Sequence, residues 1–294
     1  MSNSQPLHLS KAARYQNAAL EYYLGLTNSP YLHYGYWEPL PNSIDDLTPA
    51  RLRHAQQAYA DRLFAYLPTN VKTILDVGCG IGGNAANLVA KGFIVEGIAP
   101  DPIQQTQFLQ RTQGKAKFYL SRFEDFDGAG PYDLLLFSES SQYIAANDIA
   151  VKSRQILRPN GHLLIADMFR KSAEYDTGIF SNCRVVTELE TALKAQGFQL
   201  IQSEDISIQV APTIDICIYY FQTFGLTTLQ YIAKLLAIAA PPVYHLGRWI
   251  FRRWLKNPLT EAMQARTIFD QHLCYQIQLW HLPATTPPPA ATPE

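Results

Sequence analysis

Charged side chains are scarce in this sequence. Asp, Glu, Lys and Arg make up 17% of the 294 residues, and the formal net charge is −1. A protein that neutralises nucleic-acid phosphates normally carries a basic excess. We therefore expect no nucleic-acid partner. Hydrophobic residues reach 47%, which excludes a wholly disordered chain and allows a sizeable core.

Cysteines are few and widely spaced, at positions 79, 183, 217 and 274. No pair has a CxxC or metal-ligand spacing, so we expect reduced thiols and no metal site. The first residues lack the apolar core of a signal peptide, and the apolar stretch near 235–243 is broken by Pro241 and Pro242. Since a membrane span takes roughly 20 residues, we expect a cytoplasmic protein. The sequence leaves its oligomeric state open.

Strand-like and helix-like segments alternate from residue 71 onwards. Seven short apolar runs read as strands, and helical patterns separate most of them. This alternation predicts an α/β fold, a doubly wound and mostly parallel seven-stranded sheet. Before it, residues 10–27 look helical, and Thr48 caps a helix that begins at Pro49. The buried face of that helix is predicted to hold Leu52, Ala55, Tyr59 and Leu63.

Residues 206–270 break the alternation, since they are apolar and mostly helical in pattern. They precede the last predicted strand, in which Leu273, Tyr275, Ile277 and Leu279 share one face. We interpret them as a helical lid over a substrate pocket. The predicted divisions are an N-terminal helical and aromatic cap segment, 1–70; the core, 71–205; the lid, 206–270; the final strand, 271–282; and a disordered tail, 283–294.

A glycine-rich loop joins the first strand of the core to the next helix, in the sequence DVGCGIGG at 76–83. Gly78, Gly80 and Gly82 allow a tight turn, and the helix N-terminus favours a carboxylate or phosphate. With Gly83, the loop also matches the GxGxxG pattern of nicotinamide-binding proteins. Asp76, two residues before the first glycine, and the long segment before the loop favour a different cofactor.

Three motifs in this order resemble those of the Rossmann-like S-adenosylmethionine methyltransferases: DVGCGIGG, YDLLLFSES at 132–140 and LRPNGHLLIAD at 157–167. The resemblance covers roughly residues 45–205. Two shorter segments, YLHYGYWEP at 31–39 and ESSQYI at 139–144, are similar to those of tocopherol- and sterol-type methyltransferases. The resemblance implies a methyltransferase that uses S-adenosylmethionine. It also implies C- or O-methylation of a small lipophilic or aromatic acceptor.

Site residues follow from the same resemblance. Position 99, where relatives place an acid for the ribose, is Ala99, so Asp101 is a candidate substitute, with a plain helix cap as the alternative. Phe123 is the candidate for adenine, through its ring or its backbone amide. The residues expected to bind the cofactor are Asp76, Gly78, Cys79, Gly80, Gly82, Asp101, Phe123 and Ser138.

Methyl transfer mainly requires the acceptor to be aligned with the activated methyl group in a dry site. An acceptor hydroxyl or acidic carbon also needs a base. We assign Glu139 this role or that of orienting the cofactor, and Tyr143 a hydrogen bond to the acceptor. His33 is a third catalytic candidate. Further candidates are Asp167 at a strand end and the aromatic residues Tyr34, Tyr36 and Trp37, which equally suit packing under a loop.

The sequence RWIFRRWLK, at 248–256, combines basic and aromatic side chains within the predicted lid. Residues 244–256 therefore form either a weak peripheral membrane contact or a lid helix with a solvated basic face. Two other functions remain open at this point. One is a nicotinamide-dependent oxidoreductase, and the other is a non-catalytic cofactor-binding protein that regulates a partner.

Overall fold

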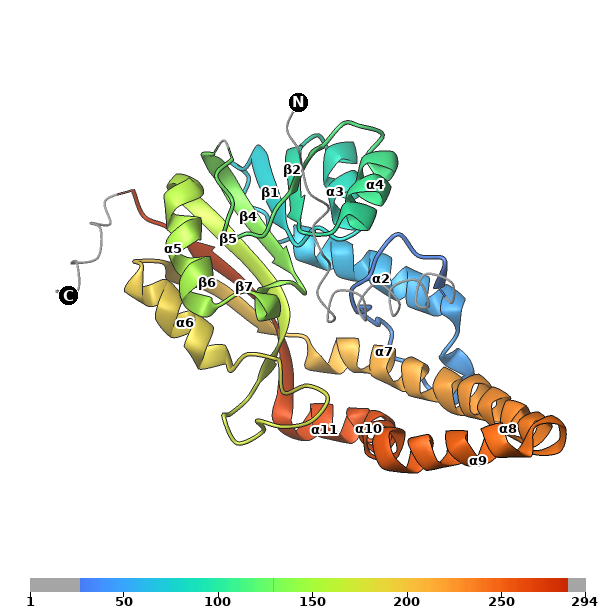
Figure 1. Ribbon diagram of the computed structural model, residues 1–294. Coiled ribbons are helices and arrows are strands. Elements are labelled where there is room, and N and C mark those ends of the chain that lie inside the picture. Colours follow the sequence, from blue (N-terminus) through green and yellow to red (C-terminus); the bar gives the residue numbers. More distant parts are fainter. Residues whose placement is uncertain (1–26, 129, 285–294) are drawn as a thin grey trace.

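A computed structural model describes residues 27–128 and 130–284. Seven strands form one sheet in the order β3-β2-β1-β4-β5-β7-β6 (Figure 1). Neighbouring strands are parallel except around β7, which is antiparallel to both β5 and β6. The predicted fold class is therefore confirmed. The strands are β1 (Thr73–Val77), β2 (Ile94–Ala99), β3 (Lys117–Leu120), β4 (Tyr132–Ser138), β5 (Leu157–Arg170), β6 (Gln199–Asp205) and β7 (Leu273–His281).

Helices cover both faces of the sheet (Figure 1). The first described one begins as predicted, because the Thr48 hydroxyl accepts a hydrogen bond from the amide of Arg51 and Pro49 occupies the first turn. The helices are α2 (Pro49–Phe64), α3 (Gly83–Ala90), α4 (Pro102–Arg111), α5 (Ala146–Ile156), α6 (Val186–Ala195), α7 (Ser207–Tyr220), α8 (Thr227–Ala239), α9 (Pro241–Ile250), α10 (Lys256–Met263) and α11 (Ala265–His272). Shorter helical turns are η1 (Ile44–Asp46), η2 (Ser141–Tyr143), η3 (Phe221–Leu226) and η4 (Phe251–Leu255).

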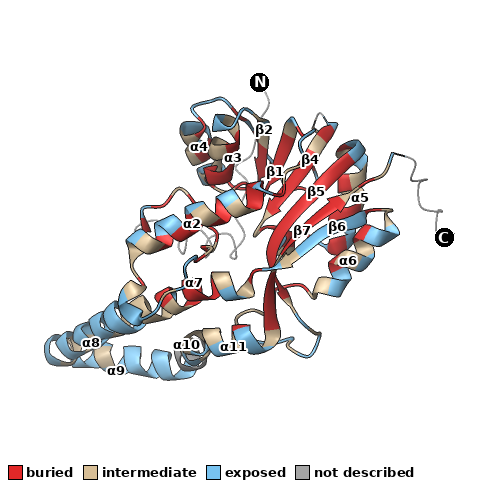
Figure 2. Cartoon of the chain, turned by 180° about the vertical axis from the view of Figure 1, so that it is seen from behind, coloured by how far each residue is buried: buried red, intermediate tan, exposed pale blue. Residues whose placement is uncertain are grey.

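The core consists of two main apolar clusters, one on each side of the sheet. Helices α2, α3, α7 and α11 contribute to one cluster, and α5 and α6 to the other. Strand β7 feeds both, because Tyr275 and Ile277 belong to the first and Cys274 and Trp280 to the second. The face predicted for β7 is thus confirmed. Figure 2 shows the central strands of the sheet as mostly buried and the edge strand β6 as mostly exposed.

The order of strands reverses between β1 and β4, which lie side by side. The chain leaves β1 toward β2 and β3, and leaves β4 toward β5. A crevice forms at such a switch point, beyond the carboxyl ends of the strands, and ligands of doubly wound sheets bind there. The glycine loop follows β1 and Glu139 follows β4, so the sequence of strands brings both to this crevice.

The helical segment before β7 has two distinct parts. Residues of α7 and α11, such as Val210, Ile214 and Phe269, are buried in the core. Helices α8 and α9 instead project from the body as a hairpin (Figures 1 and 2). The predicted lid insertion is therefore partly a packed layer of the core. The predicted helix at 10–27 and tail at 283–294 fall almost entirely outside the described residues.

Pro159, Asn160 and Gly161, a combination typical of turns, lie inside β5. Asn160 adopts a left-handed conformation there, with φ of 62°. The pairing of β4 with β5 shifts register at this point, since Tyr132 faces Leu157 and Leu134 faces His162. The turn residues therefore form an irregularity within a longer strand.

Candidate active site at the switch point

The glycine loop is built for close approach to its backbone. Gly78, Gly80 and Gly82 have φ of 70°, 51° and 84°, a region that other residues adopt only under strain. A Cβ atom at Gly78 would lie 2.4 Å from the Cβ of Ser140, which follows β4. The Ser140 hydroxyl donates to the Val77 carbonyl at 2.5 Å. The loop after β1 is thus packed against the chain after β4.

Asp76 is almost completely buried beside this loop. Burial alone raises the pKa of its carboxyl to about 7. Its Oδ2 atom has no hydrogen-bond partner among the residues described. Buried carboxyl oxygens are nearly always paired in folded proteins, so this atom fits a ligand with a hydrogen-bond donor or a positive charge. Cys79, also buried, has a thiol whose pKa is raised well above its usual value by desolvation.

Two further cofactor candidates have structural roles of their own. Asp101 is buried and accepts a hydrogen bond at 2.8 Å from the amide of Ile103, so it caps α4. Phe123 is buried with its ring against Phe137 at 5.4 Å between centroids. Its backbone amide therefore suits an adenine contact better than its ring. Cofactor contact by either residue stays a prediction.

The N-terminal aromatic segment covers the glycine loop. A Cβ atom at Gly83 would lie 2.3 Å from the Pro30 carbonyl oxygen, and one at Gly80 would lie 3.2 Å from Cδ1 of Leu32. Thr213 of α7 fixes the same segment, because its hydroxyl accepts hydrogen bonds from the Gly35 amide at 3.0 Å and the Trp37 ring nitrogen at 2.9 Å. The segment 30–37 is therefore held between the loop and α7.

Glu139 is the carboxylate that the segment 30–37 contacts. It follows β4 in a left-handed conformation, with φ of 56°. Its Oε1 accepts hydrogen bonds from the Tyr34 amide and from the Tyr275 hydroxyl, both at 2.7 Å. Desolvation raises the pKa of Glu139 to about 8, although both hydrogen bonds favour the ionised form. Burial therefore outweighs the two hydrogen bonds in setting the pKa of this carboxyl.

Two buried tyrosines support Glu139, and sequence reasoning did not assign them to the site. The hydroxyls of Tyr59 and Tyr275 are 2.8 Å apart, and Tyr275 continues the chain of hydrogen bonds to Glu139. Ser138 lies 3.5 Å from the Tyr59 hydroxyl. Burial raises the pKa of both tyrosines well above 10, so both stay protonated. Their positions on apolar faces predicted core residues and gave no sign of this contact.

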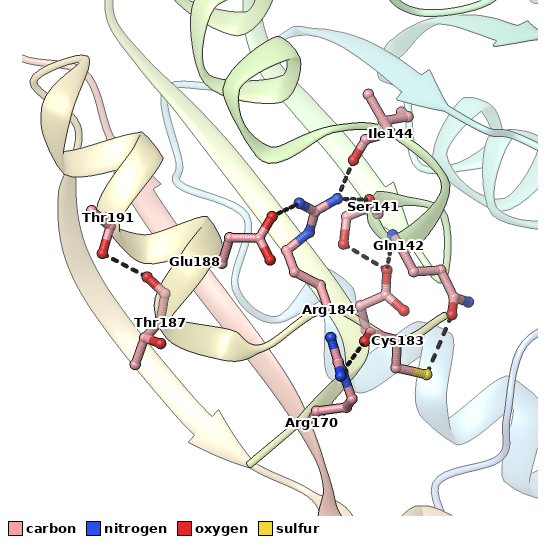
Figure 3. A network of polar contacts seen from close by, with 10 residues as sticks. Ser141, Gln142, Ile144, Arg170, Cys183, Arg184, Thr187, Glu188 and Thr191 are labelled. Carbon is pink, nitrogen blue, oxygen red and sulfur yellow. Dashed lines mark hydrogen bonds and ion pairs between the residues drawn. The ribbon is translucent and has the colours of Figure 1, made fainter. Parts of the chain in front are cut away.

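The turn after Glu139 is anchored by Asp167 and by Arg184, whose contacts with Ser141 and Ile144 are drawn in Figure 3. The Ser141 hydroxyl and Gln142 amide donate to Asp167 at 2.6 and 3.2 Å. Arg184 donates to the carbonyls of Ser141 and Ile144. Asp167, predicted as a site candidate at the end of a strand, thus holds the η2 turn. Its carboxyl is fully buried, and burial raises its pKa to about 6.

His33 and Tyr143 occupy different environments. The His33 ring is buried between Tyr31 and Tyr59, with centroid distances of 4.8 and 4.2 Å, and its Nδ1–H donates to the Tyr34 carbonyl. Burial lowers the pKa of His33 to about 4, so the ring is neutral at pH 7. The Tyr143 side chain is 57% exposed. Tyr34 connects His33 to Glu139, because its carbonyl accepts a hydrogen bond from His33 and its amide donates one to Glu139. Tyr143 lies at the surface.

An apolar cavity of about 390 Å³ lies beside this cluster. His33, Tyr34 and Leu32 form one wall, so the cavity adjoins both the Glu139 contact and the glycine loop. Trp37 does not line it and packs with Leu47 and Leu52 instead. The other lining residues are Ile179, Phe180, Thr213, Ile214, Cys217, Ile218, Phe221, Ala262 and Ala265.

The described residues contain no group of three or more His, Cys, Asp or Glu side chains that could hold a metal ion. The four cysteines are all free. A glycine loop at the switch point, a buried carboxylate beside it and an adjoining apolar cavity define an enzyme of the doubly wound class that binds a small cofactor and a second small molecule.

The comparisons with known proteins identify the family within that class. A family model described as a methyltransferase domain matches residues 51–203, and the chain belongs to this family. It is an S-adenosylmethionine-dependent methyltransferase of small molecules, as the sequence motifs predicted. The oxidoreductase and non-catalytic alternatives are not supported.

Two curated relatives agree with this result. The methyltransferase GfsG of Streptomyces halstedii is 29% identical over 201 residues, which cover 62% of this chain and 70% of the relative. The O-methyltransferase cnsE of Penicillium expansum is 25% identical over 232 residues, covering 71% of this chain and 79% of the relative.

Solved structures match nearly the whole chain at the level of the fold. The [4+2]-cyclase SpnF has a TM-score of 0.67 and 16% identity, covering 93% of this chain and 95% of its own. The geranyl diphosphate C-methyltransferase of Streptomyces coelicolor has a TM-score of 0.64 and 14% identity, covering 92% and 99%. One of these neighbours is a cyclase, so the acceptor chemistry must be argued from this chain's own residues.

Proposed function

We propose that this enzyme methylates a lipophilic acceptor, at carbon or oxygen, that binds in the cavity beside the glycine loop. One observation carries the proposal: the cavity is lined mainly by apolar side chains, and Leu32 contacts both the cavity and the loop. A dry apolar site beside the methyl donor favours an acceptor with little charge.

The donor site is assigned to the residues around the loop. Asp76, Gly78, Cys79, Gly80 and Gly82 would hold S-adenosylmethionine on the β1 side. Ser138, Asp101 and the backbone of Phe123 complete the proposed set. When bound, the cofactor supplies a methyl group already activated by its sulfonium. The bare backbone of the three glycines and the unpaired Oδ2 of Asp76 support this assignment.

Glu139 is proposed as the base for an acceptor that must lose a proton. It is held by Tyr34 and Tyr275 next to the cavity wall, and its raised pKa makes it a stronger base than an ordinary carboxylate. His33, with a pKa near 4, is a much weaker base. Tyr143 is proposed to act only on the part of an acceptor that reaches the surface, since its side chain is mostly exposed.

The predicted divisions acquire roles in this proposal. The core, 71–205 with 271–282, binds the donor, while the aromatic part of 1–70 and the insertion 206–270 enclose the acceptor. A membrane contact of residues 244–256 would suit this acceptor class, because a lipophilic molecule is concentrated in a membrane.

Product mass tests the acceptor class. The enzyme is incubated with methyl-deuterated S-adenosylmethionine and with organic-soluble and aqueous fractions of an extract from its source. We expect a labelled product in the organic-soluble fraction. A labelled product found only in the aqueous fraction would contradict the lipophilic acceptor.

A cavity-filling variant tests the location. Ala262→Trp places a bulky ring in the cavity, and Ala90→Trp places the same ring on an exposed end of α3. We expect Ala262→Trp to lose most turnover with unchanged affinity for S-adenosylhomocysteine, and Ala90→Trp to keep both. Equal turnover in the two variants would exclude this cavity as the acceptor site.

A further inference from the structure

Helices α8 and α9 form a hairpin with an uncovered apolar surface. Neither helix contains a buried residue, and both are drawn as almost wholly exposed in Figure 2. More than half of the exposed large apolar side chains of the described residues belong to this hairpin and its flanking turns. Such a concentration of exposed apolar side chains is typical of an interaction site. The exposed side chains are Phe224, Leu229, Tyr231, Ile232, Leu235, Ile238, Val243, Leu246, Trp249, Ile250 and Phe251.

The charge of the same segment selects its partner. Between Asp215 and Glu261 there is no acidic residue, whereas five basic ones occur, at 234, 248, 252, 253 and 256. The net charge of −1 therefore divides into +5 on this segment and −6 on the rest of the chain (−1 − 5 = −6). Two copies of a surface with this charge repel each other. A bilayer that contains anionic lipids is complementary both to the positive charge and to the exposed apolar side chains of this segment.

The dimensions favour a position within a lipid interface. Helices α8 and α9 have 13 and 10 residues, hence lengths of about 20 and 15 Å, whereas the hydrocarbon core is about 30 Å thick. No helix among the described residues is long and apolar enough to cross a membrane. Trp249, with the Arg253 guanidinium 6.0 Å from its ring, has the amphipathic character found at membrane–water interfaces.

The hairpin begins and ends at the wall of the cavity. Ile218 and Phe221, just before α8, line the cavity, and so do Ala262 and Ala265, just after α9 and η4. We propose that the α8–α9 hairpin inserts its apolar side chains into an anionic lipid surface and brings the cavity to that surface. An acceptor dissolved in the lipid then reaches the cavity without crossing water. Only this delivery step rests on the proposed function.

Vesicle cosedimentation of the full chain tests the attachment. The probes are vesicles of phosphatidylcholine alone and vesicles with about a third of phosphatidylglycerol. We expect retention on the anionic vesicles at low salt and weaker retention as salt rises. An apolar triple variant and a charge triple variant should each lower the bound-to-free ratio at least about 10-fold. The apolar triple variant combines Ile238→Ser, Leu246→Ser and Trp249→Ser. The charge triple variant combines Lys234→Gln, Arg248→Gln and Arg252→Gln.

Matched controls carry the same changes at exposed positions elsewhere. We expect them to bind vesicles like the unaltered chain. The apolar control is Ile44→Ser with Ile94→Ser and Ile201→Ser, and the charge control is Lys72→Gln with Lys91→Gln and Lys115→Gln.

Three results would overturn the proposal. The first is the absence of retention on anionic vesicles, and the second is an equal loss of retention in the controls. The third is a dimer in sedimentation velocity, without vesicles, that the apolar triple variant abolishes, because it would assign the hairpin to a second copy. The rise in melting temperature caused by S-adenosylhomocysteine is measured for the unaltered chain and for every variant. Its absence in the unaltered chain would count against the proposed function and leave the vesicle result intact.

Discussion

Glu139 is held at the end of β4 by groups from three distant parts of the chain. The Tyr34 amide and the Tyr275 hydroxyl fix its Oε1, and its backbone amide donates to the Ala166 carbonyl at 2.8 Å. A left-handed backbone conformation costs free energy at any residue other than glycine, and Glu139 adopts it. These three contacts keep that conformation, and one of them joins the carboxyl to the backbone of Tyr34, a residue that lines the cavity.

Replacement of Glu139 by Gln preserves shape and removes the base. We expect turnover, measured as release of S-adenosylhomocysteine, to fall by about 10²-fold or more while affinity for S-adenosylhomocysteine hardly changes. In the unaltered enzyme, kcat/KM should rise with pH through about 8, because only the deprotonated carboxyl is a base. Tyr143→Phe is the comparison and should cost less. Near-normal turnover of Glu139→Gln would shift the role to His33 or to an acceptor that needs no base.

Tyr275 tunes Glu139 without touching the acceptor in this scheme. Its hydrogen bond stabilises the ionised carboxyl and thereby lowers the pKa of Glu139. In Tyr275→Phe this stabilisation is lost, so the pH profile of kcat/KM should move to higher pH. Turnover at pH 7 should fall several-fold and recover in part at high pH. A lower rate with an unmoved profile would mean that Tyr275 has a purely structural role.

The sequence indicates where the glycine loop and Glu139 lie in the fold, but it does not indicate their contacts. Glu139 and the glycine loop were found because motifs and strand ends mark them locally. The contact between Tyr275 and Glu139 joins residues 136 positions apart, and that between Gly35 and Thr213 joins residues 178 apart. Such contacts depend on the order and register of strands, which local patterns do not determine.

At the scale of elements, the loop between β1 and α3 is the proposed donor site. Gly80→Val puts a branched side chain where the cofactor is proposed to lie. Gly114→Val is a matched control, since Gly114 also has a left-handed φ, 70° against 51°, but faces open space. Both changes should lower the melting temperature through backbone strain of about 1–2 kcal/mol. Only Gly80→Val should abolish the further rise caused by S-adenosylhomocysteine. An equal rise in both variants would place the cofactor elsewhere.

The strands and most helices of the core were predicted from periodicity, because each element buries one or both faces in a regular pattern. The insertion was predicted less completely. Its apolar composition is shared by α7, which packs on the core, and by α8 and α9, which do not. Composition reports how apolar a helix is, and only the packed structure shows what covers it.

At the scale of the whole molecule, three buried carboxyls make stability depend on pH. The pKa values of Asp76, Asp167 and Glu139 are raised by burial to about 7, 6 and 8. A carboxyl with a raised pKa binds more protons in the folded chain, so its contribution to stability is lost as pH rises to the folded value. His33 has the opposite effect, but only below about pH 6.5.

We therefore expect the melting temperature of the cofactor-free enzyme to fall between about pH 6.5 and 8. The variant Asp76→Asn with Glu139→Gln should flatten this dependence by an amount equal to roughly one bound proton. Scanning calorimetry at closely spaced pH values measures both. A profile that is flat in the unaltered enzyme would show that these carboxyls are hydrated in solution.

Leu32 lies beside Gly80 of the glycine loop and also lines the cavity. A shared wall makes the two sites thermodynamically reciprocal: whatever one occupant gains from the other's presence, the other gains in return. If the donor raises the affinity for the acceptor, the acceptor raises the affinity for the donor by the same factor. Leu32 is then the side chain through which the two proposed sites are coupled.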